Sequence, residues 1–220
     1  MFHYPKMPNA HGTQLEPGET VWIQDKLDGT NLAWEWNAKR GWHRQGTRTR
    51  LFDASDLQFG FTVGKQLPEL LKACDSFEYL IQQYKPKTLT VVTELYGDGS
   101  FAGSHVGESG RLYVLDVLVD NKFLLPKEIY GDLGPVDPES FIGYHGKLEH
   151  LPYYHAPRIF STDAEWSPHL VEQLRIKENV NEGVVVKSAE RRGVWAKVKT
   201  YDYMSRIKAK RPDNWKEFWE

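Results

Sequence analysis

The stretch DKLDGTN occupies residues 25–31 and places Lys26 between two aspartates, with a glycine and a small polar pair behind them. A free lysine has a pKa near 10.4, so a lysine that acts as a nucleophile at neutral pH must first lose its proton. Neighbouring cations, a bound metal ion and partial burial all favour that loss. An ordinary surface lysine would also explain Lys26, and the rest of the chain must decide between the two interpretations.

The basic residues of the chain are clustered, although its total charge is small. The chain has 220 residues and a formal net charge of −2, which suit one large domain and do not by themselves indicate a nucleic-acid binder. Residues 39–50 hold five Lys/Arg and no acid, and residues 197–211 hold six Lys/Arg and one Asp. Each stretch is either a solvated face or a basic stripe that contacts phosphates.

Cysteine usage and hydropathy indicate the compartment. The single cysteine excludes an internal disulfide, and no Cys/His cluster indicates a zinc site. The chain opens without an apolar signal-peptide run, and no apolar run reaches membrane-spanning length. We therefore expect a soluble, cytoplasmic protein that does not contact a membrane.

The apolar pattern predicts a strand-rich α+β fold in one domain. Strands are expected at residues 20–24, 31–37, 42–47, 87–97, 111–119, 182–188 and 194–200. Helices are expected at residues 67–84, in residues 163–180 after Pro168, and in parts of residues 201–220. Residues 1–20 look irregular, and residues 126–162 are too rich in Pro, Gly and Asp for a prediction.

Several polar side chains near these strands suit phosphate and nucleotide chemistry. Lys197 and Lys199 are two residues apart on a predicted strand, so they share a face and could hold one anion between them, or they could simply guard a strand edge. Glu182 and Glu94 lie at strand ends, where a carboxylate could bind Mg²⁺ or a ribose hydroxyl, or serve no such role. Arg44 suits bidentate phosphate contact.

Taken in order, these motifs resemble those of a known superfamily. The chain reads KLDG, then HRQG, TELYG, LYVLDV, EGVVVK and KVK, between residues 26 and 199. This order resembles the covalent nucleotidyltransferases, which comprise the ATP-dependent polynucleotide ligases and the mRNA capping enzymes. Asn31, two places after the glycine of KLDG, is typical of the phage-type RNA ligase 2 and RNA-editing ligase families. Asp28 departs from that pattern. Many members of those families have histidine at this place, whereas an aspartate is typical of DNA ligases.

The resemblance implies a fold, an activity and a role for each matching residue. The fold would be an ATP-grasp-like ligase catalytic domain with antiparallel sheets and flanking helices. Lys26 would form a lysyl-AMP phosphoramide with AMP from ATP, aided by Mg²⁺ or Mn²⁺. The implied nucleotide-binding residues are Asp25, Asn31, Arg44, Glu94, Lys197 and Lys199, with Glu182 as the metal ligand. Members of the superfamily usually stack an aromatic side chain on the adenine from the strand that reads LYVLDV here. In this chain either Leu115 or Tyr113 would make that contact, or both are ordinary core residues.

The expected activity is the sealing of nucleic-acid ends that carry a 5′-phosphate and a 3′-hydroxyl, with RNA favoured. AMP would pass from Lys26 to the 5′-phosphate, and the 3′-hydroxyl would then displace it. The alternatives are a minimal ATP-dependent DNA ligase and a non-catalytic nucleic-acid-binding protein of the same fold. The resemblance further implies a role in nucleic-acid repair and a phage-encoded enzyme that acts in the host cytoplasm. The expected nucleic-acid contacts are Arg48, Arg50, Arg206, Lys208, Lys210 and Arg211.

The end of the sequence leads us to expect a minimal catalytic core. Residues 1–220 would form one nucleotidyltransferase domain, with 203–220 as a short basic C-terminal segment and without the OB domain of DNA ligases. The functions of the absent domain would come from the basic stretch Ser205–Arg211 or from a partner protein. Alternatively, this segment is a terminal helix that only packs through Trp215, Phe218 and Trp219.

Overall fold

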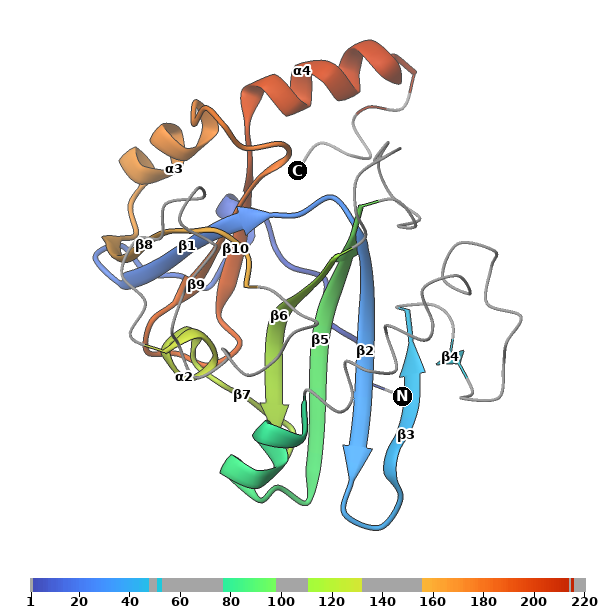
Figure 1. Cartoon of the computed structure of the whole chain (residues 1–220). Coiled ribbons are helices and arrows are strands. Elements are labelled where there is room, and N and C mark those ends of the chain that lie inside the picture. The colour runs from blue at the N-terminus through green and yellow to red at the C-terminus, as the bar shows by residue number, and fades with distance from the viewer. Residues whose placement is uncertain are drawn as a thin grey trace.

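The turn that carries Lys26 connects two antiparallel sheets (Figure 1). A computed structural model describes residues 2–47, 51–52, 77–97, 111–131, 156–213 and 215 of the chain. Strand β1 (Thr20–Lys26) belongs to a four-stranded sheet and ends at Lys26. Strand β2 (Thr30–Asn37) starts directly after the turn and belongs to a six-stranded sheet. Lys26 therefore lies where the chain passes from one sheet to the other.

Both sheets are antiparallel throughout, which confirms the predicted α+β fold with antiparallel sheets and flanking helices. The four-stranded sheet has the order β10-β9-β1-β8 and the six-stranded sheet the order β4-β3-β2-β5-β6-β7. The remaining strands are β3 (Gly41–Gly46), β4 (Leu51–Phe52), β5 (Thr88–Tyr96), β6 (Arg111–Val119), β7 (Lys122–Phe123), β8 (Ile159–Glu165), β9 (Gly183–Ser188) and β10 (Trp195–Lys199).

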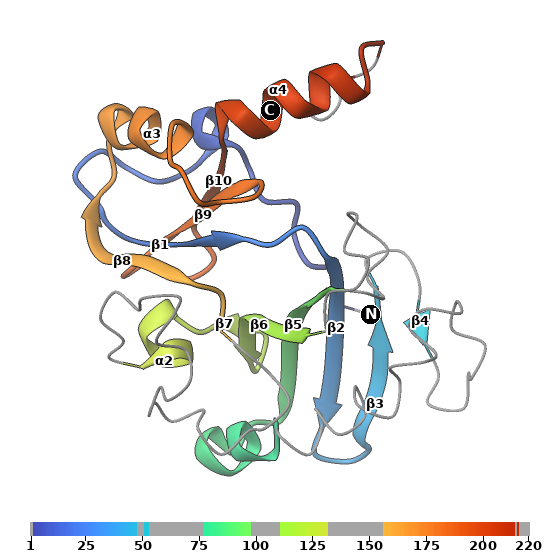
Figure 2. The ribbon, with the colours of Figure 1, turned by 45° about the horizontal axis from the view of Figure 1, so that its top comes forward.

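Short helices cover the sheets (Figure 2). They are the 3₁₀ turn η1 (Ala10–Gly12), a helix over residues 77–84, α2 (Pro126–Tyr130), α3 (Pro168–Arg175) and α4 (Tyr201–Lys210). Hydroxyl caps start α3 and α4, because Ser167 accepts a hydrogen bond from the Leu170 amide and Thr200 one from the Tyr203 amide. In both views α3 and α4 lie on the side of the four-stranded sheet that faces away from the six-stranded sheet.

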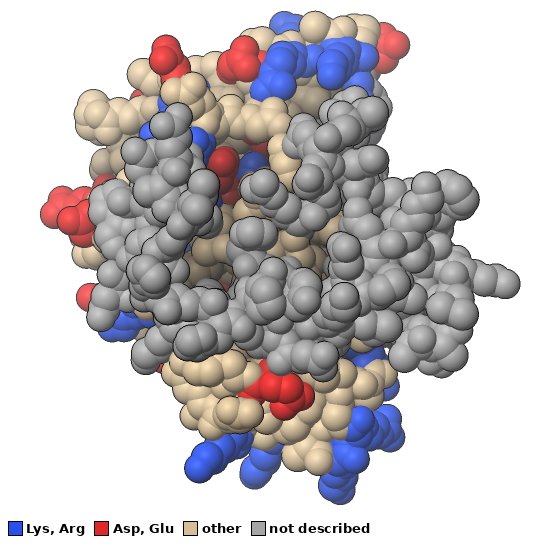
Figure 3. Space-filling view, viewed as in Figure 1, with Lys and Arg blue, Asp and Glu red and all other residues tan. Residues whose placement is uncertain are grey.

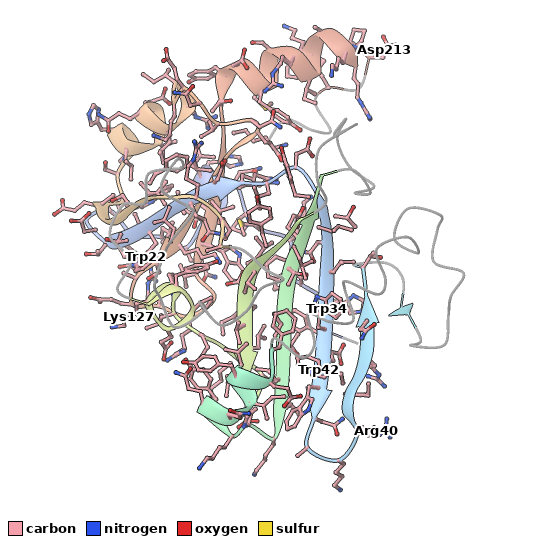
Figure 4. The ribbon with its side chains drawn as sticks, in the orientation of Figure 1. Trp22, Trp34, Arg40, Trp42, Lys127 and Asp213 are labelled. Carbon is pink, nitrogen blue, oxygen red and sulfur yellow. The ribbon has the colours of Figure 1, made fainter. Side chains whose placement is uncertain are left out.

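Apolar side chains fill both faces of the four-stranded sheet. Val21, Ile23 and Val198 point outward and pack with Leu174 of α3. On the inner face, Trp22 packs into a larger core that it shares with the six-stranded sheet. Within that core, Trp34 and Trp42 come from neighbouring strands (Figure 4) and contact Phe77 with ring centroids 6.2 and 5.6 Å away. Alternation of inward and outward side chains along each strand produces this layering.

Residues 2–9, called the N-terminal strap below, run from one sheet to the other. The Phe2 amide donates to Glu35 Oε1 of β2 at 2.6 Å, and the Tyr4 hydroxyl donates to Asp116 of β6. At the other end, the Lys197 amide of β10 donates to the Pro8 carbonyl at 2.9 Å. The strap therefore joins the two sheets, although its sequence gives only an irregular lead-in.

The structure corrects one expectation about secondary structure. Helix α3 ends at Arg175, so the helix expected after Pro168 and through residue 180 was too long. Residues 163–165, ahead of Pro168, belong to strand β8. Asn179 adopts a left-handed φ of 60°, which a continuing helix does not allow. Residues 67–76 of another predicted helix lie outside the described residues. Among the helices that the structure does describe, none is long and apolar enough to cross a membrane.

Candidate active site

A cleft of about 490 Å³ lies around the turn between the two sheets. Its size is within the usual range for small-molecule sites, about 300–1,000 Å³. In Figure 3, charged side chains of both signs are visible in a recess below α4. The cleft is lined by Tyr4, Pro5, Lys6, Met7, Gln24, Asp25, Lys26, Leu27, Gly29, Thr30, Asn31, Thr47, Glu94, Leu115, Glu182, Val185 and Lys197.

Lys26 is held by Glu182 at the end of β1. Lys26 Nζ lies 2.5 Å from Glu182 Oε2, and Lys199 Nζ lies 3.6 Å from Glu182 Oε1. The carboxylate thus bridges two lysines and is itself buried, with 5% of the residue exposed. Strand pairing produces this arrangement, since Gly183, next to Glu182, lies opposite both Lys26 and Lys199. An ion pair of this kind holds Lys26 in a fixed position before any substrate binds.

Gly183 allows β9 and β10 to approach each other at this point. A Cβ atom at Gly183 would lie 2.1 Å from the Val198 carbonyl oxygen, which is far inside van der Waals contact. Any side chain here would therefore push the strands apart and separate Glu182 from the lysines. This close approach of the strands explains why the EGVVVK motif has glycine at position 183.

Glu94 and Asn31 form the opposite wall of the cleft. They are direct partners across β2 and β5, and Asn31 Nδ2 donates to Glu94 Oε2 at 3.4 Å. The Gly29 amide donates to Glu94 Oε1 at 3.1 Å, which fixes the turn of the KLDG motif against β5. Burial raises the pKa of Glu94 to about 7, against the lowering effects of Lys26, Asn31 and Gly29. A buried carboxylate with hydrogen-bonding capacity is suited to a hydroxyl ligand.

Lys197 and Lys199 are not ordinary solvent-facing lysines of a sheet edge. β10 is indeed an edge strand of the four-stranded sheet, but Lys199 is buried and Lys197 is half-buried. Burial, together with the charges of Lys199 and Lys26, lowers the pKa of Lys197. Burial also lowers the pKa of Lys199, although Glu182 acts in the opposite direction. An anion placed between such lysines would relieve their mutual repulsion.

Asp25 lines the cleft beside Lys26 and has a partner that sequence analysis missed. Arg158 Nη2 lies 3.3 Å from Asp25 Oδ2, and the Arg158 carbonyl accepts from the Asp25 amide at 2.8 Å. Burial raises the pKa of Asp25, and Arg158 opposes that rise. The guanidinium also lies 4.4 Å from the centre of the Phe160 ring. Arg158 falls in the stretch that gave no prediction, so no sequence signal pointed to it.

A bulge in β6 decides the places of Leu115 and Tyr113. Val92 pairs with Asp116 and Thr93 with Val114, so Leu115 is an extra residue on its strand. Leu115 lines the cleft, where it offers an apolar surface. Tyr113 is paired with Glu94 but packs edge to face against Tyr96, with ring centroids 6.1 Å apart. The structure thus places Leu115, and not Tyr113, in the lining of the cleft.

Behind Leu115, a buried polar network fixes the floor of the cleft. Lys187 Nζ lies 2.8 Å from Asp116 Oδ1 and donates to the Leu115 carbonyl at 2.6 Å. The Tyr130 hydroxyl donates to the same carbonyl at 2.8 Å, and the Tyr4 hydroxyl donates to Asp116. A network that satisfies all its buried groups is rigid, so this one holds the bulge and the strap in fixed positions.

The fold agrees with that of known ligases, although comparison of the sequence finds no match. No family model and no curated protein sequence matches this chain. An apo variant of a Naegleria gruberi RNA ligase superposes with a TM-score of 0.66 at 14% identity, over 94% of this chain and 58% of that one. A variant with ATP and Mn gives 0.63 at 14% identity, over 92% and 57%. The ligase with PPi gives 0.62 at 15% identity, over 94% and 58%.

This chain has an RNA ligase nucleotidyltransferase-type fold. The similarity covers nearly all of it, whereas the chain spans less than two thirds of the length of each ligase chain. At 14% or 15% identity the likeness concerns the fold alone.

Not every predicted residue joins the cleft of this ligase-type fold. Arg44 lies opposite Glu35 across β2 and β3, with Nη1 3.9 Å from Glu35 Oε2, and is absent from the cleft lining. The contact of Arg44 with the nucleotide stays a prediction. Arg40, from the same basic stretch, lies at the tip of the β2–β3 hairpin, far from the end of α4 near Asp213 (Figure 4). Arg48 and Arg50 lie outside the described residues.

The basic residues of α4 differ in their contacts. Arg206 is tied to the protein, because it pairs with Asp202 at 3.0 Å and donates to the Asn181 carbonyl. Lys208 lies 5.2 Å from the centre of the Trp215 ring, and Lys210 and Arg211 are exposed. Phe218 and Trp219 lie outside the described residues. Figure 3 shows Lys and Arg side chains gathered over α4.

Among the carboxylates of the cleft, Glu182 is the one that we expect to bind a divalent cation. Within the described part of the chain, no group of three or more His, Cys, Asp or Glu side chains could hold a metal ion alone. Glu182 could bind Mg²⁺ or Mn²⁺ in place of the two ammonium groups that it now contacts. Mg²⁺ commonly takes one or two carboxylates and completes its shell with water and substrate phosphates, and the residues here fit that pattern.

Proposed function

We propose that this protein is an ATP-dependent RNA ligase that works through a lysyl-AMP intermediate at Lys26. One observation carries the proposal: the cleft brings together the lysine of the KLDG turn, Glu182, Lys197 and the Asn31–Glu94 pair. The fold shared with Naegleria gruberi RNA ligase, including structures of that protein with ATP and Mn and with PPi, supports the same assignment.

In the first step Lys26 Nζ would form a bond to the α-phosphorus of ATP, and the bond from that phosphorus to pyrophosphate would break. The electron pair leaves with pyrophosphate, and the lysine must give up its proton before the N–P bond forms. Until a cation binds, Glu182, which is 2.5 Å from Lys26 Nζ, positions the amine. Lys197 and Lys199 would hold the α-phosphate, where negative charge increases in the transition state. A divalent cation held by Glu182 would neutralise phosphate charge.

In the next two steps the AMP would leave Lys26. An oxygen of the nucleic acid's 5′-phosphate attacks the phosphorus of AMP, and the bond from that phosphorus to Lys26 Nζ breaks. The 3′-hydroxyl of the other end then attacks the activated 5′-phosphorus, forms the phosphodiester and expels AMP. Glu94 and Asn31 would hold the ribose of the adenylate during these steps, and Leu115 and Val185 would provide apolar surface for the base. RNA is the favoured substrate because of Asn31, whereas Asp28 keeps a DNA ligase as the second candidate.

A sealing assay on defined ends tests the proposal. We expect joining of 5′-phosphate ends to 3′-ribose ends with ATP and Mg²⁺ or Mn²⁺, because a 2′-hydroxyl distinguishes RNA from DNA. Lys26→Ala serves as the inactive control. Equal sealing of 3′-deoxyribose ends would support the DNA ligase instead, and faster labelling by GTP than by ATP would indicate a capping-type enzyme. Nucleic-acid binding without any sealing would support a non-catalytic role.

A further inference from the structure

The N-terminal strap is a wall of the cleft as well as a link between the sheets. Four of its residues, Tyr4 to Met7, line the cleft. It is anchored on both sides of Lys6: Tyr4 is buried and donates to Asp116, and the Pro8 carbonyl accepts from the Lys197 amide at 2.9 Å. Asn9 forms a bridge to Lys197 as well. The backbone at Lys6 is thus fixed while its side chain is exposed.

Lys6 and Lys197 both bring positive charge to the lining of the cleft. Both residues line it, and Lys6 contributes to the lowered pKa of Lys197 after burial and the charges of Lys199 and Lys26. The described strap, residues 2–9, carries no acidic residue, and the carboxylates of the cleft lining, Asp25, Glu94 and Glu182, come from other segments. Ammonium groups that line one cleft and lie close enough to influence each other attract an anion that fits between them.

Lys6 and Lys197, which line the cleft, and Lys199, which pairs with Glu182, differ in burial. Lys199 is buried, Lys197 is half-buried, and Lys6 is exposed. The reacting phosphate must lie near Lys26, which is half-buried, whereas the leaving phosphates must point toward solvent to depart. A cation at the exposed end therefore meets the phosphates farthest from the nucleoside. Negative charge also accumulates on these phosphates as the bond to the α-phosphorus breaks.

From this geometry we infer that Lys6 binds the β- and γ-phosphates of ATP and stabilises pyrophosphate as it leaves. The inference rests on the proposed function of the cleft, and it assigns a substrate contact to a residue outside every motif of the sequence. The rival occupant of this position is the backbone phosphate of the nucleic acid, which would also be attracted to Lys6. The two differ in the step of the reaction that they affect.

Three measurements on Lys6→Ala test the inference. Adenylylation of the protein should lose about 10- to 100-fold in kcat/KM for ATP, in line with the loss of one electrostatic contact to the transition state. Release of AMP from the adenylylated protein by added pyrophosphate should slow by a similar factor, since it is the reverse of the same step. Sealing of a strand that already carries a 5′-adenylate should stay unchanged, because that step involves no pyrophosphate.

Two variants control for folding and for general charge. Lys6→Arg keeps the positive charge and should retain most of the ATP reaction. Lys127→Ala removes an exposed lysine of α2 that is outside the cleft lining and should behave like the unmodified protein. Unchanged adenylylation in Lys6→Ala would overturn the inference, as would an equal defect with the pre-adenylylated strand, which would assign Lys6 to nucleic acid.

A binding measurement separates this inference from the proposed function. Calorimetric titration of pyrophosphate into Lys26→Ala measures the affinity of the site for pyrophosphate in a variant that cannot react. Adding Lys6→Ala to that variant should weaken pyrophosphate binding by about tenfold, as expected for one charge-assisted contact. If the unmodified protein takes no label from ATP while this difference holds, the ligase assignment fails and the anion site stands. Equal pyrophosphate affinity of the two variants would contradict the anion site itself.

Discussion

Glu94 combines burial with two hydrogen-bond donors, and its ionisation is therefore costly. Only 9% of the residue is exposed, and the Gly29 amide and Asn31 donate to its two oxygens. Burial raises its pKa to about 7 from the ordinary 4.5, although Lys26 and these donors act in the opposite direction. Near neutral pH the side chain thus exists in both protonation states, and small changes in the cleft can shift it between them.

Glu94→Gln should flatten the dependence of stability on pH. Between pH 4.5 and 7 the folded protein binds more protons at Glu94 than the unfolded chain does, so the free energy of unfolding falls as pH rises through this window. The glutamine cannot ionise, so up to about 3 kcal/mol of that fall should disappear. Urea unfolding of both proteins at pH 5, 6 and 7 measures it. Parallel pH profiles would show that Glu94 ionises normally.

Glu182 connects Lys26 and Lys199, and its charge matters both for folding and for the proposed reaction. Glu182→Gln keeps the shape but leaves two lysines facing each other without a carboxylate. We expect adenylylation to fall by about 100- to 1,000-fold, the usual loss for one well-placed electrostatic contact. Lower stability is also expected, because one partner of a buried ion pair is removed.

Glu16→Gln is the matched control for Glu182. Glu16 pairs with Arg191 at 3.2 Å, but its side chain is 78% exposed. Loss of such a surface pair should change stability by less than about 1 kcal/mol and leave adenylylation intact. Rates and urea midpoints of the two variants give the comparison. Similar adenylylation rates and urea midpoints for the two variants would mean that Glu182 contributes no more than an exposed acid such as Glu16.

At the scale of elements, close strand contacts place these side chains, and two glycines make the contacts possible. A Cβ at Gly29 would lie 2.4 Å from the Leu95 carbonyl oxygen, and one at Gly183 would lie 2.1 Å from that of Val198. Both neighbours are backbone atoms and cannot rotate away. The KLDG turn can therefore pack on β5, and β9 can lie close to β10, only with glycine at these positions.

Gly183→Ala should destabilise the protein and separate Glu182 from the lysines. Overpacking against backbone costs about 1–3 kcal/mol or more, and the strands must move to relieve it. Gly12→Ala is the control, because a Cβ there has no atom within 4 Å. Thermal and urea unfolding should show a clear loss for Gly183→Ala only. Equal stability of the two variants would contradict the close approach of β9 and β10.

The sequence predicts the central strands because their apolar residues form continuous or alternating runs. Those strands carry Asn31, Glu94, Lys197 and Lys199, and Lys26 and Glu182 lie at or next to strand ends; the structure brings these side chains near one another. Features that depend on contacts between distant segments could not be predicted. The strap has no periodic pattern, Arg158 lies in a stretch without a signal, and the bulge at Leu115 depends on pairing with β5.

At the scale of the whole molecule, the cleft opens beside a basic helix. α4 follows directly from β10, which carries Lys197 and Lys199, and its exposed lysines and arginines gather on one side of the view in Figure 3. Helix α4 thus adds positive charge at the surface beside the lysines of the cleft. A nucleic-acid backbone near the cleft would meet this charge first.

Neutralising Lys208, Lys210 and Arg211 together, each to Gln, should weaken nucleic-acid binding. If all three contact phosphates, the slope of log affinity against log salt should become shallower by roughly two to three, with the largest difference at low salt. Arg206→Gln is a separate variant, since Arg206 also holds α4 to Asn181. Fluorescence titrations with RNA at several salt concentrations measure the slopes. Identical slopes would indicate that α4 serves only the fold.

The central claim is that Lys26 carries AMP. The most direct measurement is incubation of the protein with labelled ATP and Mg²⁺ or Mn²⁺, followed by peptide mapping of the label. We predict one adenylate per chain, on Lys26, through a bond that is labile in acid and stable in alkali, as a phosphoramide is. Lys26→Ala should take no label, and Lys127→Ala should be labelled normally. Labelling that persists in Lys26→Ala, or that maps to another residue, would contradict the account.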